Sequence, residues 1–275
     1  MKKHLIFLPV VFIVIFLALA YINAGTRVYT INFASDKNLE VGEELTYVVS
    51  YTFIKFGEIK IIVKGKKVID GQNYYSTIAY MDSYSGIPFV NLHMIYESTM
   101  NPKYYSVFFR GIVKKDEYTT FTEYYTDYTK DKTRIKKGKI KPYQLWTDST
   151  TSAKQEFQDG LSILYFARMF SGSGKSISLP CFVNEKKSIT TMTSYTQATG
   201  VSIDAVDYDI NCVKLDGNMN FVSVFGLTGY FEGWFSNDAA SIPIVAKLKV
   251  IIGNVRVELK SWKRTGWMPP KFKKN

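Results

Sequence analysis

The segment ELTYVVSYT, residues 44–52, has the two-residue period of a β-strand. Successive side chains of an extended chain point to opposite sides, so every second residue shares a face. The segment is therefore predicted to be a strand with two chemically different faces. One carries Leu45, Tyr47, Val49 and Tyr51, and the other carries Thr46, Val48, Ser50 and Thr52.

Strand-like runs recur along the rest of the chain. The 275 residues include 20 Tyr and 19 Phe, and this aromatic enrichment favours pleated, half-buried surfaces. Such runs extend from Phe56–Val63 to Val255–Trp262 and include 201–208 and 220–225, giving about twelve strands. Lys130–Lys141, around Gly138, is predicted to be a charge-rich hairpin or loop.

One segment, DGLSILYFARMF at Asp159–Phe170, is predicted to be a helix. Asp159 is a suitable N-cap, and the Ser171–Gly174 segment (SGSG) is a stop signal. Apolar residues, among them Leu164, surround almost the whole circumference, which is typical of a buried helix. Arg168 must then reach a carboxylate or the rim, because an unpaired buried charge is costly.

Together these patterns predict a mainly β fold. We expect a large curved antiparallel sheet, or a partly closed barrel, of about twelve strands, with the helix against its concave side. No linker or shift in composition divides residues 25–265, so they are expected to form a single antiparallel β-domain. Residues 266–275, with Pro269-Pro270 and three lysines, are expected to be a flexible basic tail.

The first 24 residues predict export. Lys2 and Lys3 precede the apolar run Leu5–Leu17, and Ala18-Leu19-Ala20 has the small-x-small pattern of a cleavage site. These features are typical of a secretory signal peptide. An uncleaved membrane anchor is the alternative, because apolar character continues through Tyr21-Ile22. Either reading places the rest of the chain in the periplasm or outer cell envelope.

The formal net charge of +11 bears on partners. In an exported protein, basic character favours anionic lipids or other anionic envelope components over nucleic acid. The lysines of Lys130–Lys141 lie between the aromatic tract Tyr118–Tyr128 and the residues Tyr143 and Trp146. This segment, like the N-terminal one, is therefore a candidate membrane contact. A solvated hairpin whose lysines protect a sheet edge is the other interpretation.

Cys181 and Cys212 are the two cysteines of the chain. An oxidising compartment would permit a disulfide between them, with one connectivity only. Two free, buried cysteines are the alternative, because a thiol packs as a small apolar group.

The motifs resemble those of a bacterial exported family, domain-of-unknown-function family 3108. The block FQDGLSILYFAR at Phe157–Arg168 is similar to the family's most recognisable motif. VGEELTY at 41–47 with FGE at 56–58 resembles its start, and GWFSND at 233–238 with Ile242-Pro243-Ile244 resembles a later signature. The match spans about residues 41–262, although Asn237 stands where acidic residues are common in the family. The resemblance implies an exported, mainly antiparallel domain and no assigned reaction.

The common catalytic patterns are missing from the sequence. His93 is the one histidine beyond the first 24 residues, and no G-x-S-x-G, H-E-x-x-H or C-x-x-C occurs. Carboxylate pairs drawn from Asp159, Glu156, Asp238 and Glu232 could in principle serve a glycan enzyme. Structural roles are preferred for Asp159 as a cap and Asp238 in a turn. We therefore predict no catalytic residue, metal or cofactor.

The favoured function is a non-catalytic exported module that binds an apolar or amphipathic ligand, such as a lipid. The competing classes are a structural or assembly factor of the envelope and, third, a carboxylate-based glycan enzyme. Four residues are assigned structural roles: Asp159, Leu164, Arg168 and Asp238. The candidate ligand-binding residues are aromatic: Tyr47, Phe56, Tyr80, Tyr165, Phe166 and Trp234.

Overall fold

The computed structural model describes residues 39–87, 91–115, 117–221, 228–250 and 253–273. The chain divides into two units, residues 1–33 and 34–275, and every described residue belongs to the second. The predicted signal peptide or anchor at 1–24 lies outside the described residues. In the described ranges, no helix has the length and apolarity needed to cross a membrane.

Fourteen strands form one antiparallel sheet in the described part of the chain. They are β1 (Glu44–Tyr51), β2 (Ile54–Ile69), β3 (Gln72–Ser83), β4 (His93–Met100), β5 (Ser106–Lys114), β6 (Thr119–Asp127), β7 (Lys132–Lys139), β8 (Gln144–Ser152), β9 (Ser176–Val183), β10 (Lys186–Val201), β11 (Ile210–Met219), β12 (Gly229–Ser236), β13 (Pro243–Val250) and β14 (Gly253–Lys263). A short 3-10 turn, η1 (Tyr128–Lys130), precedes β7, and one α-helix, α2 (Ser162–Phe170), lies between β8 and β9.

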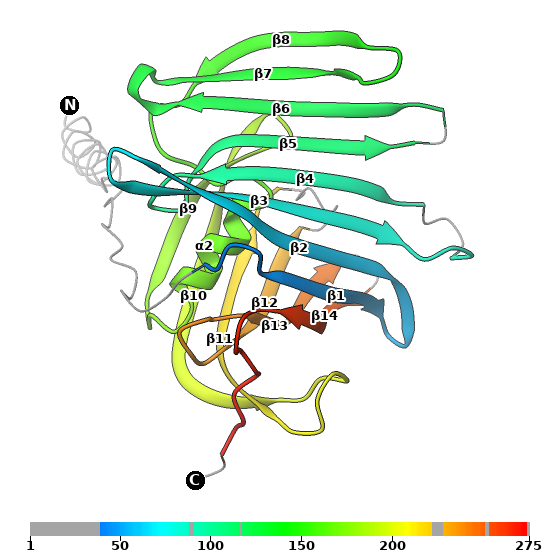
Figure 1. Ribbon diagram of the computed structural model, residues 1–275, viewed down its shortest axis with the longest axis vertical. Helices are drawn as coiled ribbons and strands as arrows, with labels where there is room; N and C mark the ends of the chain where they lie inside the picture. Colours follow the sequence, from blue (N-terminus) through cyan, green and yellow to red (C-terminus); the bar gives the residue numbers. More distant parts are fainter. Residues whose placement is uncertain (1–38, 88–90, 116, 222–227, 251–252, 274–275) are drawn as a thin grey trace, which may run out of the picture. The chain divides into compact units, whose positions relative to one another are not determined.

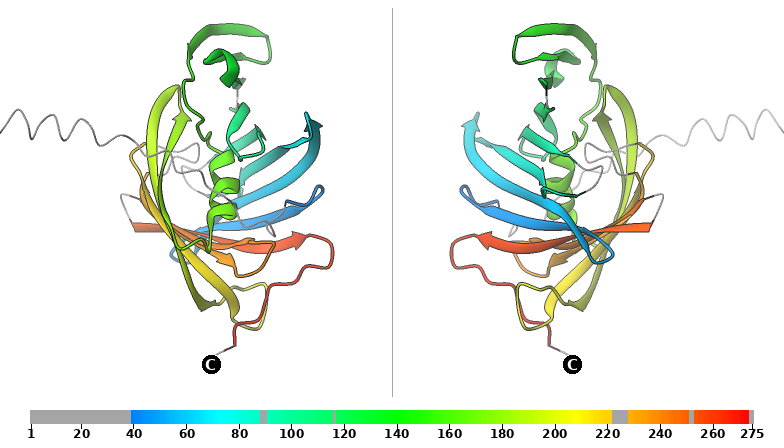
Figure 2. Two further views of the ribbon diagram at one scale, coloured as in Figure 1. Left: turned by 90° about the vertical axis from the view of Figure 1, so that its left-hand side faces the viewer. Right: turned by 90° about the vertical axis from the view of Figure 1, so that its right-hand side faces the viewer.

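The sheet consists of two meanders joined at the ends of the chain. Its order is β8-β7-β6-β5-β4-β3-β2-β1-β14-β13-β12-β11-β10-β9, so β1 pairs with β14. The segment that contains α2 leads from one edge strand, β8, to the other, β9. The sheet curves around α2, as Figures 1 and 2 show. The prediction of a curved antiparallel sheet around one buried helix is confirmed, with fourteen strands instead of about twelve.

Helix α2 lies against the concave side of the sheet. Tyr165, Phe166 and Phe170 are at most 1% exposed, whereas Leu164 is only half-buried. The helix begins at Ser162, later than expected, but Asp159 still serves its first turn. The Asp159 carboxylate accepts hydrogen bonds from the backbone N–H groups of Leu161 and Ser162, both at 2.7 Å. Asp159 therefore satisfies two amides that a helix start leaves unpaired.

Two segments differ from the sequence-based expectation, and a third cannot be compared with it. Lys130–Lys141 is largely strand β7, hydrogen-bonded on both sides by β6 and β8. Most of 201–208 is a loop, because β10 ends at Val201 and β11 begins at Ile210. Most of 220–225 lies outside the described residues. Local alternation could not distinguish an extended loop from a strand that finds a partner.

The C-terminal segment 266–272 is docked, contrary to the predicted flexible tail. Asn211 N–H donates to the Pro270 carbonyl at 2.7 Å, and Phe272 N–H donates to the Asp209 carbonyl at 2.8 Å. The Trp267 ring packs edge-on against Trp262, with centroids 5.5 Å apart. Composition suggested fraying, but two aromatic side chains and these backbone bonds attach the segment to the sheet.

Cys181 and Cys212 are free and buried, so the suggested disulfide is not formed. Cys181 on β9 pairs with Ser188 of β10, and Cys212 on β11 pairs with Thr199 of the same strand. A whole strand thus separates them laterally, and their partners lie on the order of 30 Å apart along β10. This exceeds the 7 Å limit on the Cα separation of a disulfide.

Candidate ligand-binding cleft

An apolar cleft of about 350 Å³ lies on the side of the sheet that faces α2, here called the inner face. Its walls come from β1, β2 and β3, from β13 and β14, and from Leu164 of α2. The lining is mostly aliphatic: Val49, Ile59, Ile61, Met81, Leu92, Leu164, Pro243, Val245, Ala246, Leu248, Val255 and Val257, with Tyr47 and Phe56. Gly57, Glu58, Asp82 and Ser83 complete the wall. The aliphatic part of this lining suits the hydrocarbon portion of a ligand.

Strand register explains why these side chains meet. Val49 of β1 lies opposite Val257 of β14, which lies opposite Ala246 of β13. Directly opposed residues of antiparallel strands share a face, so the three form one row across three strands. All three are half-buried, although none is polar. A filled interior would cover such residues, and here they line open space.

The predicted aromatic residues divide into three groups. Tyr47 and Phe56 line the cleft, and the Tyr47 hydroxyl donates to the Pro243 carbonyl at 3.0 Å. Tyr165 and Phe166 are buried in the helix packing, at 1% and 0% exposure, and do not line the cleft.

Tyr80 and Trp234 lie on the opposite, outer face. Tyr80 pairs with Lys60, next to the inner residue Met81. Trp234 packs under the ammonium groups of Lys214 and Lys247, 5.9 and 5.2 Å from the ring centroid. Register, which the sequence does not specify by itself, decided which aromatic residues face inward.

Sequence reasoning missed the aliphatic residues of β13 and β14. Ala246, Leu248, Val255 and Val257 line the cleft, yet none was a candidate. The available signal was their alternation with Lys247, Arg256 and Glu258, which marks one apolar face. The candidate ligand-binding residues chosen from the sequence were all aromatic, so this aliphatic face was not among them.

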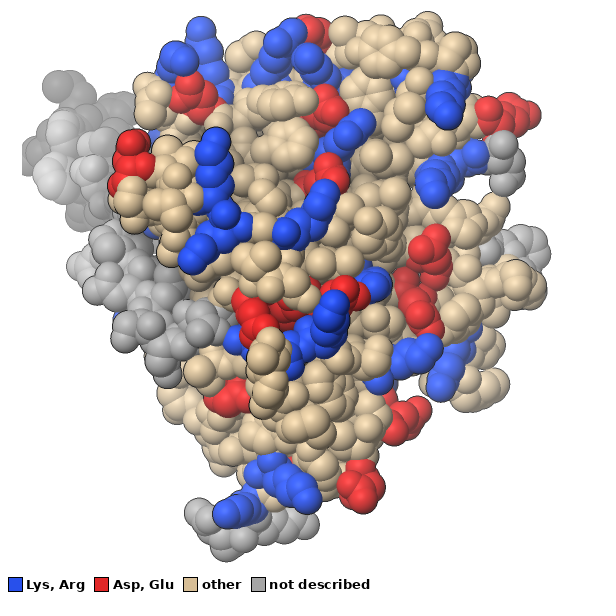
Figure 3. All heavy atoms as spheres, viewed as in Figure 1, with Lys and Arg blue, Asp and Glu red and all other residues tan. Residues whose placement is uncertain are grey.

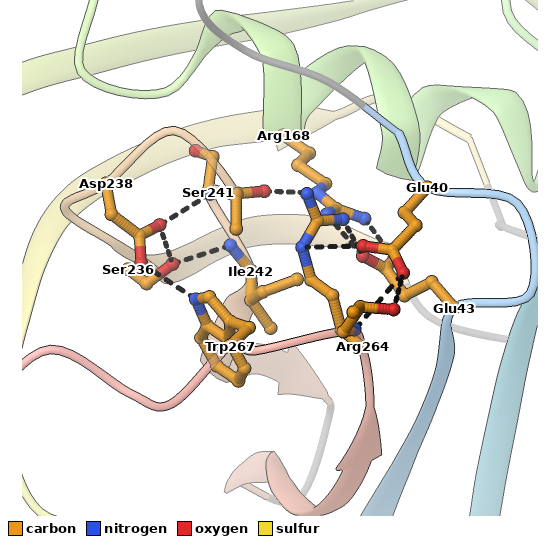
Figure 4. Close-up of polar contacts among 11 residues, drawn as sticks. Glu40, Glu43, Arg168, Ser236, Asp238, Ser241, Ile242, Arg264 and Trp267 are labelled. Atoms are coloured by element: carbon orange, nitrogen blue, oxygen red, sulfur yellow. Dashed lines mark hydrogen bonds and ion pairs between the residues drawn. The ribbon is translucent and has the colours of Figure 1, made fainter.

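A buried ionic cluster joins segments far apart in the sequence (Figure 4). Arg168 of α2 donates to both carboxylate oxygens of Glu43, at 2.5 and 2.8 Å, and from Nε to the Ala240 carbonyl at 2.8 Å. Arg264 Nη1 donates to the same carboxylate at 2.5 Å. Arg168 and Glu43 are only 1% and 2% exposed, which confirms that Arg168 reaches a carboxylate.

The charge of Arg168 is maintained despite its burial. Burial alone would lower the pKa of the guanidinium, but the hydrogen bonds and negative charge of Glu43 outweigh it and raise the pKa. Every charge of the pair is matched by an opposite charge and fixed by hydrogen bonds. The cluster therefore links helix α2 to segments that are far apart in the sequence.

Asp238 organises a turn beside this cluster (Figure 4). Its carboxylate accepts from the Ser236 hydroxyl at 2.8 Å, the Ser241 N–H at 2.9 Å and the Trp267 indole N–H at 2.8 Å. The structural role expected of Asp238 is thus present, and Trp267 connects it to the docked C-terminal segment.

The other carboxylates considered for catalysis are engaged by neighbours. Asp159 is fully buried and accepts from the Ser98 hydroxyl at 2.6 Å. Glu156 accepts from the side chains of Asn101 and Lys103, and Glu232 accepts from Lys214. None of these acids lines the apolar cleft.

Charges gather on the outside of the molecule. On the face shown in Figure 3, Lys and Arg side chains are interspersed with Asp and Glu. Ion pairs across neighbouring strands, such as Lys60–Glu44 at 2.5 Å and Arg134–Asp148 at 2.5 Å, account for part of this pattern. The inner cleft and the charged exterior therefore differ sharply in polarity.

The fold and the cleft define an open antiparallel β-sheet protein wrapped around one helix, with an apolar hollow on its inner face. Within that class, the chain belongs to the protein family of unknown function DUF3108, whose model matches residues 46–260. The resemblance seen in the sequence motifs is thereby confirmed. A search of curated proteins finds no significant match.

A solved structure supports the fold. A β-barrel-like protein of domain of unknown function DUF1849 from Brucella abortus has a TM-score of 0.52 at 10% identity, over 81% of this chain and 97% of that one. Two others are more distant. A proposed lipoprotein from Parabacteroides distasonis has a TM-score of 0.38 at 9% identity, over 86% and 100% of the two chains. A proposed exported protein with a YmcC-like fold from Bacteroides fragilis has a TM-score of 0.37 at 8% identity, over 83% and 98%.

Proposed function

We propose that this protein is a non-catalytic module of the cell envelope that binds the acyl chain of a lipid or related amphiphile in the inner cleft. The observation that carries the proposal is the row of half-buried aliphatic side chains around open space. Export, as proposed from Lys2-Lys3 and the following apolar run, would bring the module to lipid-bearing surfaces.

The size of the cleft agrees with such a ligand. Its volume of about 350 Å³ falls within the ~300–1,000 Å³ range of small-molecule sites. A dry cavity of ~150 Å³ holds benzene, so this space can take a longer hydrocarbon. Each buried methylene contributes about 0.8 kcal/mol, and several together give useful affinity without any polar contact.

The absence of reaction chemistry is part of the proposal. The acids weighed for catalysis serve as a helix cap, a turn and partners of lysines, and none lies in the cleft. A structural factor with a filled interior is less well supported, because the cleft leaves apolar side chains uncovered.

The test is binding of a fluorescent fatty-acid probe to the delipidated protein. Ala246→Phe should fill the cleft and weaken binding at least tenfold, since Ala246 is half-buried and its added ring would enter the space. Melting temperature should stay close to wild type, because the ring occupies an existing hollow.

Ile189→Phe is the matched control, because Ile189 is 51% exposed and does not line the cleft. It should bind the probe like wild type. Equal binding by wild type and Ala246→Phe, or no binding by either, would contradict the proposal.

A further inference from the structure

A second cleft of about 510 Å³ continues the first along the inner face. The two share Met81 and Leu92 in their walls. The second cleft extends over β4, β5, β6 and β7, and reaches the turn between β9 and β10. The apolar space is therefore one end of a longer trough.

Register shows how polarity changes along this trough. One row of opposed residues runs across six strands, β1 to β6: Tyr47, Ile59, Met81, Met94, Val113 and Thr120. At ~4.8 Å between strands, this row is ~24 Å long. A neighbouring row, Tyr96, Gly111, Thr122 and Lys137, runs across β4 to β7. The first row is apolar from Ile59 to Val113 and ends at the hydroxyl of Thr120, and the second ends at the ammonium group of Lys137.

The polar end contains one cation and one anion. Lys137 Nζ lies 2.7 Å from Glu185 Oε2, and the side chains are 35% and 32% exposed. Glu185 also accepts from the Tyr124 hydroxyl at 3.0 Å, which fixes its carboxylate above β6. Lys137 and Glu185 are the two charged residues in the wall of this second cleft.

A floor of aromatic rings lies beneath this pair. Phe109 stacks between Tyr96 and Tyr124, with centroids 6.0 and 5.3 Å away. Gly111 keeps the floor open, because a Cβ there would lie 3.2 Å from the Tyr96 ring. The polar end is thus a shaped recess with a rigid base.

We propose that the trough binds an amphiphile with an acyl chain in the apolar cleft and a zwitterionic head group, carrying phosphate and ammonium, at Lys137 and Glu185. This assignment rests on the proposed function. An acyl chain spans ~15 Å, half of a ~30 Å bilayer core, so the ~24 Å row leaves room for a head group. A purely anionic head group would meet Lys137 but also face Glu185, whereas a zwitterion offers an opposite charge to each of them in place of their mutual contact.

The experiment compares three probes of equal acyl length below their micelle concentrations: lysophosphatidylethanolamine, lysophosphatidylglycerol and the free fatty acid. Each displaces a fluorescent fatty acid from the full, delipidated protein. Wild type should bind the zwitterionic probe about fivefold or more tighter than the two anionic ones, the factor expected for one partly exposed charge contact.

Two single substitutions should shift the preference between anionic and zwitterionic probes in opposite directions. Glu185→Gln should strengthen binding of both anionic probes relative to the zwitterion, and Lys137→Gln should weaken them. Lys186→Gln, at the start of β10 beside this turn and outside the clefts, is the control and should leave all ratios unchanged. Melting curves verify that each variant is folded.

The outcomes separate the two proposals. If all probes bind wild type equally, or if the Lys137 and Glu185 variants leave the ratios unchanged while Ala246→Phe still abolishes binding, the head-group assignment is wrong and the acyl cleft stands. If no probe binds, or if Ala246→Phe has no effect on any of them, the proposed function itself is wrong.

Discussion

The Glu43 carboxylate forms ion pairs with two arginine side chains. It accepts from Arg168 and Arg264, whose side chains are 1% and 8% exposed. Three of the family-like motifs meet here, because Arg168 also bonds the Ala240 carbonyl just beyond the GWFSND segment. Removing one partner of a buried pair leaves an uncompensated charge, which costs more than the pair contributes in total.

We expect Glu43→Gln to lower the free energy of unfolding by about 3–5 kcal/mol, because it removes the charged carboxylate that the Arg168 and Arg264 guanidinium groups share. Denaturant melts provide the measurement. Adding Arg168→Met should recover part of the loss. Lys64→Met, which removes the exposed Lys64–Glu97 contact, should cost less than about 1 kcal/mol. A loss for Glu43→Gln as small as that control would show that the cluster is solvated.

The raised pKa of Asp159 predicts how the stability of the fold depends on pH. Burial raises the pKa of its carboxyl group, and hydrogen bonds such as that from Ser98 oppose this only in part. An acid with a higher pKa in the folded state holds its proton more tightly when folded. Its contribution to stability is then fully present below the unfolded pKa, near 3.8, and is lost as the pH rises through the folded pKa.

Asp159→Asn should remove this dependence and keep an oxygen for the helix amides. Relative to the variant, wild type should become less stable as the pH rises from about 3.8, the unfolded pKa, through the raised folded pKa. Urea melts of both proteins at several pH values give the difference directly, since the other acids are common to both. A constant difference across that window would rule out the raised pKa.

At the level of elements, helix α2 has one side that packs in the core and another that lines the apolar cleft. Phe166 is fully buried, whereas Leu164 is half-buried and lines the apolar cleft. From the sequence alone both residues are expected to be buried, because both belong to a helix that is apolar on almost all sides. The curvature of the sheet leaves one side of the helix open, and this makes their roles different.

Phe166→Ala should cost about 3–5 kcal/mol of stability, as expected for a large side chain removed from a packed core. Leu164→Ala should cost less than about 2 kcal/mol, because its side chain already borders open space. The affinity for the fluorescent fatty acid should change more in Leu164→Ala than in Phe166→Ala. Thermal melts and probe titrations of the two variants test this, and the reverse order would place Leu164 in the core.

On the scale of the whole molecule, the two ends of the described chain hold the sheet together. β1 pairs with β14 along the full length of β1, and this pairing joins the two meanders. The segment 266–272 then returns to Ile210 and Asp209 at the start of β11. The C-terminal residues therefore contribute to the second meander, although they follow its last strand.

Deletion of residues 266–275 should lower the free energy of unfolding by about 1.5–3 kcal/mol, the contribution of one large apolar side chain, because Trp267 and Phe272 lose their contacts. Deletion of 273–275 alone is the control and should change stability by no more than ~0.5 kcal/mol. Unfolding by guanidinium chloride measures both. Equal stability of the two truncated proteins would restore the flexible-tail interpretation.

Local chemistry along the chain was sufficient to predict most of the strands, the helix with Asp159 near its start, and the need of Arg168 for a carboxylate or the rim. Each depends on neighbours within a few residues, where periodicity and capping operate. Pairing across the sheet depends on residues far apart, such as Val49, Ala246 and Val257, and on the register that aligns them. For this reason the identity of Glu43 as the partner of Arg168, the separation of Cys181 from Cys212, the outward position of Tyr80 and Trp234, and the cleft itself appeared only once the strands were assembled.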